Sequence, residues 1–428
     1  MSTPLPLHKP IFSFYGDDFT GSTDALEALS VNGIRTVLFL RTPYGDDLCN
    51  FQGCRAVGIA GESRSRSPEW MRQALPLVFE RLREIGAPIV QYKVCSTFDS
   101  SPETGSIGCA LEIGREVFGG QCVGVVPAAP LLERYVVFGN LFAAGGGRIH
   151  RIDRHPAMSE HPTTPMDESD LLVHLGRQMM HRPTLVNLHE LRGNSFHWPA
   201  DTGAVLFDGL ESGDMKLTAE RIWEQRHKPQ TFVVGSSGFT YGMLDYWRAQ
   251  GWLPDSEPAA ESGSIRQDGR LLVLAGSCSP ATERQIRSAL RAGFHGIRLN
   301  PTELNMSGAE GEAVSQLAAG RNVILYSALG PDDRVAIEDR PALATAMGKL
   351  LRRVILASRV SRVLVAGGDT ASHAARELDV SALTFVASLV RGAPLCRAHW
   401  WPGDLQLVLK GGQIGPETFF EEVRSWNS

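Results

Sequence analysis

The stretch "IFSFYGDDFTGSTDALEAL" (residues 11–29) joins an apolar run, a glycine, two adjacent aspartates and an amphipathic segment. The run has the length of a buried strand, and the alanines and leucines from residue 25 recur with helical spacing. The stretch therefore predicts a strand that passes into a helix around residues 20–22, with Asp17 and Asp18 at the junction. Acidic residues are stabilised near a helix N-terminus, so helix capping beside a solvated acid remains an alternative to chemistry.

The same alternation of strand-length and amphipathic segments continues to about residue 128 and resumes after residue 270. Such alternation is typical of parallel sheets covered by helices. Between the two series, residues 251–270 are rich in Gly, Pro, Ser and charge. We expect an α/β fold with two domains, residues 1–250 and 271–428, joined by a linker over 251–270. Each domain should hold a largely parallel sheet flanked by helices.

Composition argues against several classes of protein. The net charge of −5 does not favour a surface that binds phosphate backbones, so we expect no nucleic-acid partner. No apolar run reaches the ~18 residues that span a bilayer, and the N-terminus lacks a secretory pattern. We expect a cytoplasmic protein with no membrane partner. The histidines of the irregular stretch 143–170 lack zinc-site spacing, so no metal-ligating residues are predicted; a loop of that length is usually functional or mobile.

Three strands of the second series end in glycine-rich turns, in "AGSCSPAT" (275–282), "AGGDTAS" (366–372) and "LKGGQIG" (409–415). Ser279 is a predicted N-cap before Pro280, which exposes N–H groups suited to a phosphate. Asp369 could orient a ribose hydroxyl or hold Mg²⁺ through water. Because the carboxyl ends of parallel strands share one edge, these turns together predict a nucleotide site. Neither GxxxxGK[ST] nor GxGxxG is present.

The N-terminal half places polar residues at comparable strand ends. Lys93 ends one predicted strand and is followed by Ser96 and Thr97, and Arg64 lies just past another. A lysine and an arginine there would suit the carboxylate of an acid substrate, although such a residue taken alone is more often a surface charge. Of the two aspartates, one could accept a proton from a substrate hydroxyl while the other orients the substrate.

Six motifs in order, "YGDDFTGSTD" (15–24), "YKVCST" (92–97), "VPAAP" (126–130) and the three glycine-rich turns, resemble the four-carbon acid sugar kinases across nearly the entire chain. The resemblance implies an ATP-dependent kinase, with Mg²⁺ bound together with ATP. It implies an N-terminal acid-sugar domain, a C-terminal ATP domain and an active site in the cleft between them. Members phosphorylate the terminal hydroxyl of threonate, erythronate or 3-oxo-tetronate.

Carried over by position, the resemblance implies site residues in both halves. Asp17 and Asp18 would lie at the acceptor's hydroxyls, with either one as the base. The predicted acceptor-site residues are Arg64, Lys93, Ser96, Thr97, Asp99 and Arg134. The predicted ATP contacts are Ser277, Ser279, Gly367, Gly368, Asp369, Thr370, Gly411 and Gly412.

The chain departs from the family pattern in the acid-sugar half. Cys95 stands where the family has an acid, and Asp99 stands where an arginine is usual. With "HPTTPMDESDL" (161–171), these departures favour a subgroup acting on branched, oxidised pentonates such as 3-oxo-isoapionate, with the tetronates as alternatives. A sugar-acid dehydrogenase is disfavoured because GxGxxG is missing, and a non-catalytic ligand-binding regulator stays open. The sequence does not define the oligomeric state, so a homodimer also stays open.

Overall fold

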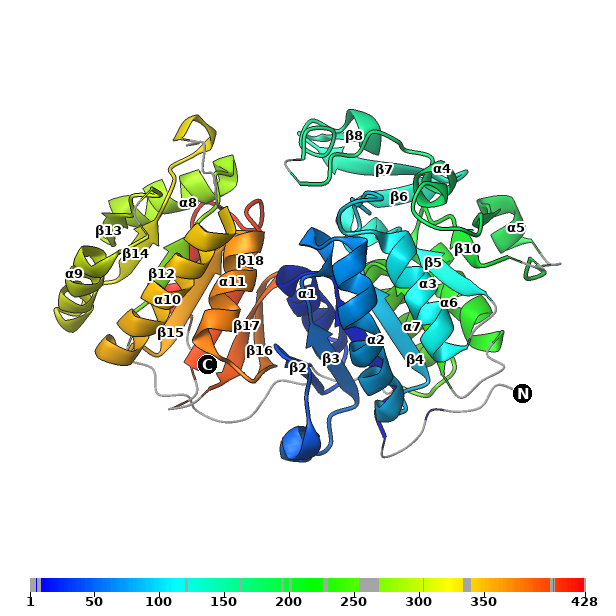
Figure 1. The fold of residues 1–428 in the computed structure, drawn as a ribbon, viewed down its shortest axis with the longest axis horizontal. Helices are drawn as coiled ribbons and strands as arrows, with labels where there is room; N and C mark the ends of the chain where they lie inside the picture. The colour runs from blue at the N-terminus through cyan, green and yellow to red at the C-terminus, as the bar shows by residue number, and fades with distance from the viewer. Residues whose placement is uncertain are drawn as a thin grey trace. The chain divides into compact units, whose positions relative to one another are not determined.

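The computed structural model describes residues 5, 9–119, 122–161, 163–193, 196–199, 202–225, 230–253, 269–302, 304–333, 340–400, 403 and 405–426 (Figure 1). The chain divides into two compact units, Met1–Thr36 with Thr42–Ala259 and Val37–Arg41 with Ala260–Ser428. Residues 254–268 of the predicted linker lie outside the described residues. Residues 37–41, which the sequence pattern places in the N-terminal domain, belong to the second unit.

The first unit is built on a parallel sheet. Its strands follow the order β3-β1-β4-β11-β5-β10-β9. Their bounds are β1 Phe12–Gly16, β3 Ala56–Ala60, β4 Ile89–Lys93, β5 Val123–Val126, β9 Thr184–Val186, β10 Ala204–Phe207 and β11 Thr231–Gly235. Every residue of β1, β3 and β4 is buried, as expected for strands covered on both faces.

The helices of this unit fill the connections between strands (Figure 1). They are α1 Phe19–Ser30, α2 Pro68–Ile85, α3 Ile107–Phe118, α4 Leu171–Gly176, α5 Leu188–Arg192, α6 Ser212–Glu224 and α7 Ser237–Ala249. Short 3₁₀ turns cover Gly45–Phe51, Ser63–Ser65, Pro130–Leu132 and Ile152–Arg154. The helix α2 packs beside α3, whereas α1 and α6 each pack beside α7.

The order of the central strands creates a switch point at β1. The chain runs from β1 to β3 on one side and then crosses to β4 on the other, so β1 lies between them. The register pairs Gly16 with Ala60 and with Lys93, which brings three strand ends together. In open α/β sheets, ligands bind outside the carboxyl ends of strands at such a reversal.

A small antiparallel sheet begins just before the irregular stretch 143–170 and extends into it, a feature that the sequence did not predict. It consists of β6 (Arg134–Val137), β7 (Asn140–Gly145) and β8 (Arg148–Arg151). The β7–β8 hairpin turns at Gly146 and Gly147, whose φ angles of 58° and 76° favour glycine.

The second unit has strand order β13-β14-β12-β15-β18-β17-β16-β2. The strands are β2 Thr36–Phe39, β12 Leu272–Ala275, β13 His295–Arg298, β14 Val323–Tyr326, β15 Arg362–Ala366, β16 Ala382–Val390, β17 Ala393–His399 and β18 Leu405–Lys410. The five strands from β13 to β18 in this order are parallel, whereas β17, β16 and β2 add antiparallel pairings. This sheet also reverses, because β13 and β14 lie to one side of β12 and β15 lies to the other.

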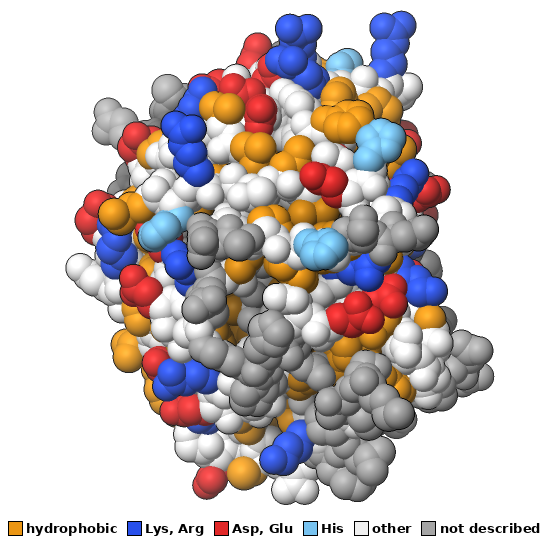
Figure 2. Space-filling model, turned by 90° about the vertical axis from the view of Figure 1, so that its right-hand side faces the viewer, with side chains coloured by type: hydrophobic (Ala, Val, Ile, Leu, Met, Phe, Trp, Pro, Cys, Tyr) orange, Lys and Arg blue, Asp and Glu red, His pale blue; other side chains and the backbone are white. Residues whose placement is uncertain are grey.

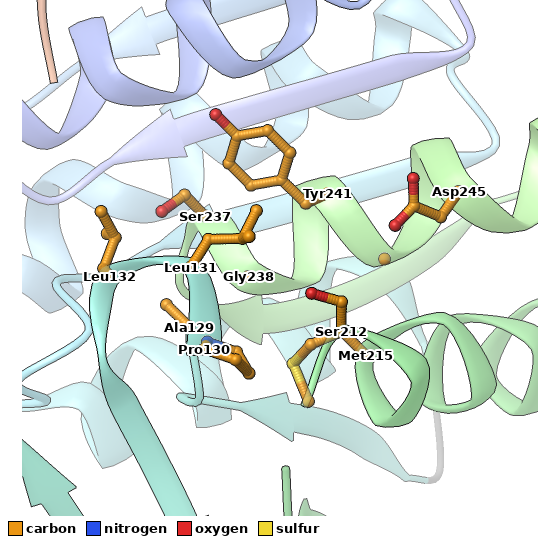
Figure 3. Close-up of a pocket in the computed structure, with 11 residues that line it drawn as sticks. Ala129, Pro130, Leu131, Leu132, Ser212, Met215, Ser237, Gly238, Tyr241 and Asp245 are labelled. Carbon is orange, nitrogen blue, oxygen red and sulfur yellow. The ribbon is translucent and has the colours of Figure 1, made fainter. Parts of the chain in front are cut away.

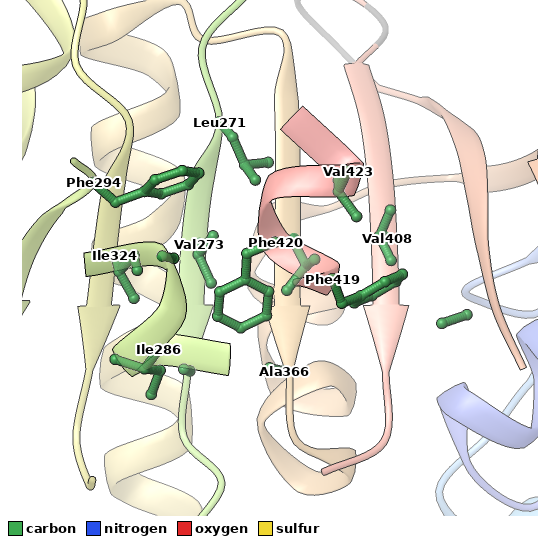
Figure 4. Close-up of a cluster of buried hydrophobic side chains, with 14 of the residues drawn as sticks. Leu271, Val273, Ile286, Phe294, Ile324, Ala366, Val408, Phe419, Phe420 and Val423 are labelled. Carbon is green, nitrogen blue, oxygen red and sulfur yellow. The ribbon is translucent and has the colours of Figure 1, made fainter. Parts of the chain in front are cut away.

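A hydrophobic core holds the second unit together (Figure 4). The helices are α8 Pro280–Arg291, α9 Ser307–Ala318, α10 Arg340–Ser358, α11 Gly368–Leu378 and α12 Phe419–Ser425, with a 3₁₀ turn at Pro331–Asp333. Phe419 and Phe420 of α12 belong to one buried cluster with Val273 of β12 and Val408 of β18. Burial of such side chains stabilises the fold by about 1.5–3 kcal/mol each, so α12 secures the strands that end in the glycine-rich turns.

Candidate active site

The acidic pair forms the connection from β1 to α1. Asp18 is the N-cap of α1, and its carboxylate accepts a hydrogen bond from the backbone N–H of Gly21. The helix consequently begins at Phe19, earlier than the predicted residues 20–22, because the Asp18 carboxylate satisfies the free N–H group of Gly21 in the first turn. At Gly16, a Cβ atom would lie 2.0 Å from Ser22 Oγ, so the turn needs glycine for close packing.

Asp17 is buried, in contrast to the solvated acid that capping alone would leave. It is 3% exposed, and its N–H donates to the carbonyl of Lys93 at 2.9 Å. Within the described residues its Oδ1 has no hydrogen-bond partner. Burial, followed by the charge of Asp18, raises the pKa of Asp17 to about 7, although Arg64 and Lys93 oppose the rise. A buried carboxyl with an available oxygen and a pKa near neutrality has the properties of a general base.

Arg64 binds two of the acidic residues. Its Nε and Nη2 donate to the Asp99 carboxylate, at 3.1 Å to Oδ2 and 2.5 Å to Oδ1. Its Nη1 donates to Asp18 Oδ2 at 3.0 Å. Burial alone would lower the pKa of Arg64, but Asp99, Cys95 and the acidic pair outweigh it and hold that pKa well above its usual value. Arg64 is therefore a fixed cation beside the acidic pair.

Asp99, which replaces an arginine of the family pattern, is the buried partner of Arg64. Its side chain is fully buried, and Thr97 Oγ1 and Thr164 Oγ1 also donate to it, at 2.6 and 2.8 Å. Burial would raise the pKa of Asp99, but Arg64 and the Thr97 hydrogen bond hold it well below its usual range. Asp99 thus keeps its charge and holds Arg64 in place.

Lys93 is paired with a further carboxylate, on α1. Its Nζ lies 3.2 Å from Asp24 Oδ2 and donates to the Val94 carbonyl at 3.2 Å. Burial alone would lower the pKa of Lys93, but Asp24, Cys95 and the acidic pair outweigh it, so the pKa is raised. Ser96 and Thr97, which follow β4, are buried, and Thr97 contacts Asp99 rather than Lys93 in the hydrogen bonds described for it.

Arg134 differs from the other two basic candidates. It begins β6, and its Nη1 donates to the backbone carbonyls of Leu132 and Glu133 at 2.8 and 3.2 Å. Its buried Nε has no hydrogen-bond partner within the described residues, where none of the ion pairs involves Arg134. Arg64 and Lys93 have their charges balanced by carboxylates, whereas Arg134 keeps a charge available for an anion.

In the second unit, the three glycine-rich turns converge. β12, β15 and β18 are adjacent, so the turns after Ala275, Ala366 and Lys410 lie at one edge. Ser279 caps α8 as predicted, accepting from Thr282 N–H, and its hydroxyl donates to the Gly412 carbonyl at 2.6 Å. A Cβ atom at Gly412 would lie 2.3 Å from Ser277 Oγ. Residues that were predicted to contact ATP therefore lie against one another, although more than 130 residues separate them in the sequence.

The turn after β15 passes directly into a helix. The helix α11 begins at Gly368, with Gly367 as its N-cap. Gly367 has a φ of 122°, which residues with a Cβ rarely adopt. Thr370 lies in the first turn, near Gly276 and Gly367. The side chain of Asp369 lies outside the described residues.

Lys410 is a candidate site residue that was not among those predicted from the sequence, where it only ends a predicted strand. It is fully buried, and its Nζ donates to Thr282 Oγ1 at 3.3 Å. Thr282 in turn donates to the Gly412 carbonyl at 2.8 Å, so Lys410 lies directly beneath the converging turns. Burial lowers the pKa of Lys410 to about 7. Lys410 was overlooked because it ends an apolar strand. A lysine at the end of a buried run is unusual, and this could have identified it as a candidate.

Two hollows in the first unit lie apart from the acidic pair. One, of about 10 Å³, is lined by residues of the turn after β5 and of α7, including Leu131, Ser237 and Tyr241 (Figure 3). Another, of about 470 Å³, lies beside β9 and α5. Neither lining includes the acidic pair, Arg64 or Lys93. The candidate site is therefore the group of hydrogen-bonded charges at the switch point.

Three further observations concern metal sites, membrane spans and the surface. Among the described residues, no group of three or more His, Cys, Asp or Glu side chains is arranged to hold a metal ion. No described helix is long and apolar enough to cross a membrane. On the face shown in Figure 2, acidic and basic side chains are interspersed among hydrophobic ones.

The fold and its two candidate sites define an α/β protein with a charged site in one unit and a glycine-rich, helix-capped site in the other. Two family models match it: a sugar-binding N-terminal domain over residues 12–243 and a nucleotide-binding C-terminal domain over residues 272–420. The chain is 43% identical to a 3-oxo-isoapionate kinase of Paraburkholderia graminis, covering 97% of this chain and 94% of that protein. It is 29% identical to a 3-oxo-tetronate kinase of Cupriavidus necator, covering 97% of each.

Solved structures share the fold. A protein from Salmonella typhimurium LT2 superposes with a TM-score of 0.77 at 24% identity, covering 97% of this chain and 98% of that one. A Haemophilus influenzae protein gives a TM-score of 0.73 at 23% identity, over 96% and 99%. The family matches and the curated relatives show that the chain belongs to the four-carbon acid sugar kinase family. The resemblance read from the six sequence motifs is confirmed.

Proposed function

We propose that this protein is an ATP-dependent kinase that phosphorylates the terminal hydroxyl of a small sugar acid. The observation that carries the proposal is Asp17, a buried carboxyl at the switch point with an oxygen left without a partner among the described residues. The relatives named as sugar-acid kinases support the reaction class.

In the acceptor unit, the Asp17 carboxylate would take the proton of the terminal hydroxyl. The hydroxyl oxygen then bonds to the terminal phosphorus of ATP, the bond from that phosphorus to the bridging oxygen breaks, and ADP leaves with the bonding electrons. Asp18, oriented by Arg64 and by its capping bond, would accept a hydrogen bond from another acceptor hydroxyl. Because Arg64 and Lys93 already pair with carboxylates, Arg134 is the basic residue best suited to the acceptor's acid group.

In the nucleotide unit, the turns around Ser277, Ser279, Gly367 and Gly412 would bind the phosphates of ATP. The N-terminus of α8 offers N–H groups and a positive dipole end, and Lys410 adds a cation beneath the turns. Mg²⁺ would enter with the nucleotide, since this ion usually keeps waters and binds phosphate oxygens; it would neutralise charge on the transferring phosphate. The location of the active site in a cleft between the domains stays a prediction.

The acceptor proposed first is 3-oxo-isoapionate, with 3-oxo-tetronates, threonate and erythronate as alternatives. The support is the higher identity to the 3-oxo-isoapionate kinase than to the 3-oxo-tetronate kinase, together with the Asp99 departure.

The decisive experiment incubates the protein with MgATP and each acceptor separately, and identifies products by mass spectrometry. We expect a product 80 Da heavier than the acceptor, formed together with ADP, and the highest kcat/KM for 3-oxo-isoapionate. If no acceptor gains a phosphate, the kinase proposal is wrong, and the hypothesis of a non-catalytic ligand-binding regulator is favoured.

The variants Asp17→Asn and Asp18→Asn make a matched pair, because each removes one charge without changing shape. Loss of a general base typically costs about 10²–10⁴-fold in rate, so we expect Asp17→Asn to lose this much of kcat with little change in the KM for ATP. Asp18→Asn should act mainly on the KM for the acceptor. Equal behaviour of the two variants would contradict the assigned roles.

A further inference from the structure

The segment 161–166, described at residues 161 and 163–166, lies within the irregular stretch that the proposed function does not use, and it contacts the candidate site of the first unit. Thr164 Oγ1 donates to Asp99 Oδ2 at 2.8 Å, and His161 Nδ1 lies 4.0 Å from the same oxygen. The two residues also contact each other, since the Thr164 backbone N–H donates to His161 Nδ1 at 3.2 Å. The Thr164 hydroxyl therefore bonds to the carboxylate oxygen of Asp99, and His161 acts by holding Thr164 through its backbone N–H.

The segment is fixed where it meets Asp99. Thr164 is 1% exposed, and Met166 is fully buried with its N–H bonded to the Met158 carbonyl at 2.9 Å. Thr163, by contrast, is exposed. Two threonines in sequence thus differ in environment, and only the inner one bonds to Asp99 in the contacts described for this pair.

The contact continues from Asp99 to the acidic pair. Arg64 donates hydrogen bonds from Nε and Nη2 to Asp99 and from Nη1 to Asp18. These are charge-assisted hydrogen bonds in a buried setting, where they are stronger and more directional than surface contacts. The position of Arg64, and through it that of the Asp18 carboxylate, depends on how Asp99 is held.

We propose that Thr164 and His161 are positioning residues for the acceptor site, acting through Asp99 on Arg64 and Asp18. This inference rests on the proposed function for its substrate class, a sugar acid. The segment 161–166 then affects how the acceptor binds and leaves ATP binding unchanged. It also explains why Asp99 replaces a basic residue: a carboxylate is required to connect a threonine to an arginine.

The kinetic test uses three variants at neighbouring positions. Thr164→Val removes the hydroxyl at constant shape, Thr164→Ser keeps it, and Thr163→Val makes the same change at the exposed position. Loss of a hydrogen bond to a charged group typically changes an equilibrium about 10- to 100-fold. We expect Thr164→Val to raise the KM for the acceptor about 10-fold, with the KM for ATP within twofold. Thr164→Ser and Thr163→Val should match the wild type.

A second readout does not depend on activity. In a ¹H–¹⁵N spectrum, the Arg64 Nε–H signal should be protected from solvent exchange in the wild type and exchange at least about tenfold faster in Thr164→Val. An unchanged Arg64 signal would overturn the inference even if no acceptor were phosphorylated. If the wild type phosphorylates no acceptor but Arg64 Nε–H exchanges faster in Thr164→Val, the proposed function is contradicted and the positioning role of Thr164 is not.

A structural effect on folding has a separate outcome. If Thr164→Val does not fold, His161→Asn carries the test, since the His161 side chain is 31% exposed and tolerates replacement more readily. An acceptor KM that rises with an unchanged ATP KM supports the inference. Equal rises in both KM values, or none, overturn it.

Discussion

At the scale of single residues, adjacent aspartates serve different purposes because their environments differ. Asp18 faces the helix N-terminus and Arg64, whereas Asp17 is enclosed and one of its oxygens has no described partner. The sequence could predict that carboxylates lie at this junction, since the strand and helix patterns are clear. It could not assign the roles, because the roles depend on Arg64 and Lys93, which lie 46 or more residues away.

The pH dependence of the reaction tests Asp17. A general base works only when deprotonated, and its pKa is raised to about 7. We therefore expect kcat/KM for the acceptor to fall about tenfold per pH unit below about pH 7 and to level off above it. Asp17→Asn should lose this acid limb in its residual activity. A wild-type profile that stays flat down to pH 5 would contradict the assignment.

Stability separates this chemical effect from unfolding. Because the folded state raises the pKa of Asp17, folding favours the protonated form, and this contribution is lost as pH rises from about 4 through 7. Asparagine resembles the protonated form, so Asp17→Asn should be at least as stable as the wild type at pH 8, by up to about 4 kcal/mol. Denaturant unfolding at pH 5 and pH 8 measures the difference. If Asp17→Asn is less stable than the wild type at pH 8, its inactivity is explained by unfolding and not by loss of the base.

At the scale of elements, the repeated strand-to-helix pattern predicted most of the architecture, including the passage from β1 into α1. It predicted the glycine-rich turns but not the small sheet β6–β8, because its short antiparallel strands lack a strong period. It also did not predict the β16–β17 hairpin, because the residues of a strand do not reveal whether its neighbour is parallel or antiparallel. It also did not identify Lys410, whose importance comes from the turns of three separate strands meeting above it.

Lys410 should have two measurable effects. Its pKa is lowered to about 7 by burial, so its charge destabilises the folded state below pH 7, and the penalty disappears as pH rises towards 10.5. We expect Lys410→Met to raise the melting temperature by several degrees at pH 6 and hardly at all at pH 10. If the turns bind phosphate, the same variant should weaken ATP binding about tenfold at pH 7 by calorimetry.

The control for this pair of effects is Lys349→Met, which removes an exposed lysine of the same unit. It should leave both stability and ATP affinity unchanged. A Lys410→Met protein that binds ATP as tightly as the wild type would exclude Lys410 from phosphate binding, while the pH-dependent gain in stability would still report its burial.

At the scale of the whole molecule, the N-terminal segment supplies a strand to the C-terminal unit. Residues 37–39 of β2 pair antiparallel with residues 382–384 of β16. This pairing could not be predicted from the sequence, because a strand of apolar residues can pair with either sheet and its partner lies more than 340 residues away. Without β2, the edge of β16 would expose unpaired N–H and carbonyl groups.

This arrangement predicts that a substitution near the N-terminus weakens the nucleotide unit. Leu38 is fully buried, and Leu→Ala in a core typically costs about 2–5 kcal/mol. We expect Leu38→Ala to accelerate hydrogen exchange in β16 and β17 and to lower the stabilisation that ATP gives. The matched control is Leu29→Ala in α1, also fully buried, which should accelerate exchange in the first unit instead. If both variants loosen only the first unit, then β2 contributes little to the second, and the N- and C-terminal halves fold independently of this exchanged strand.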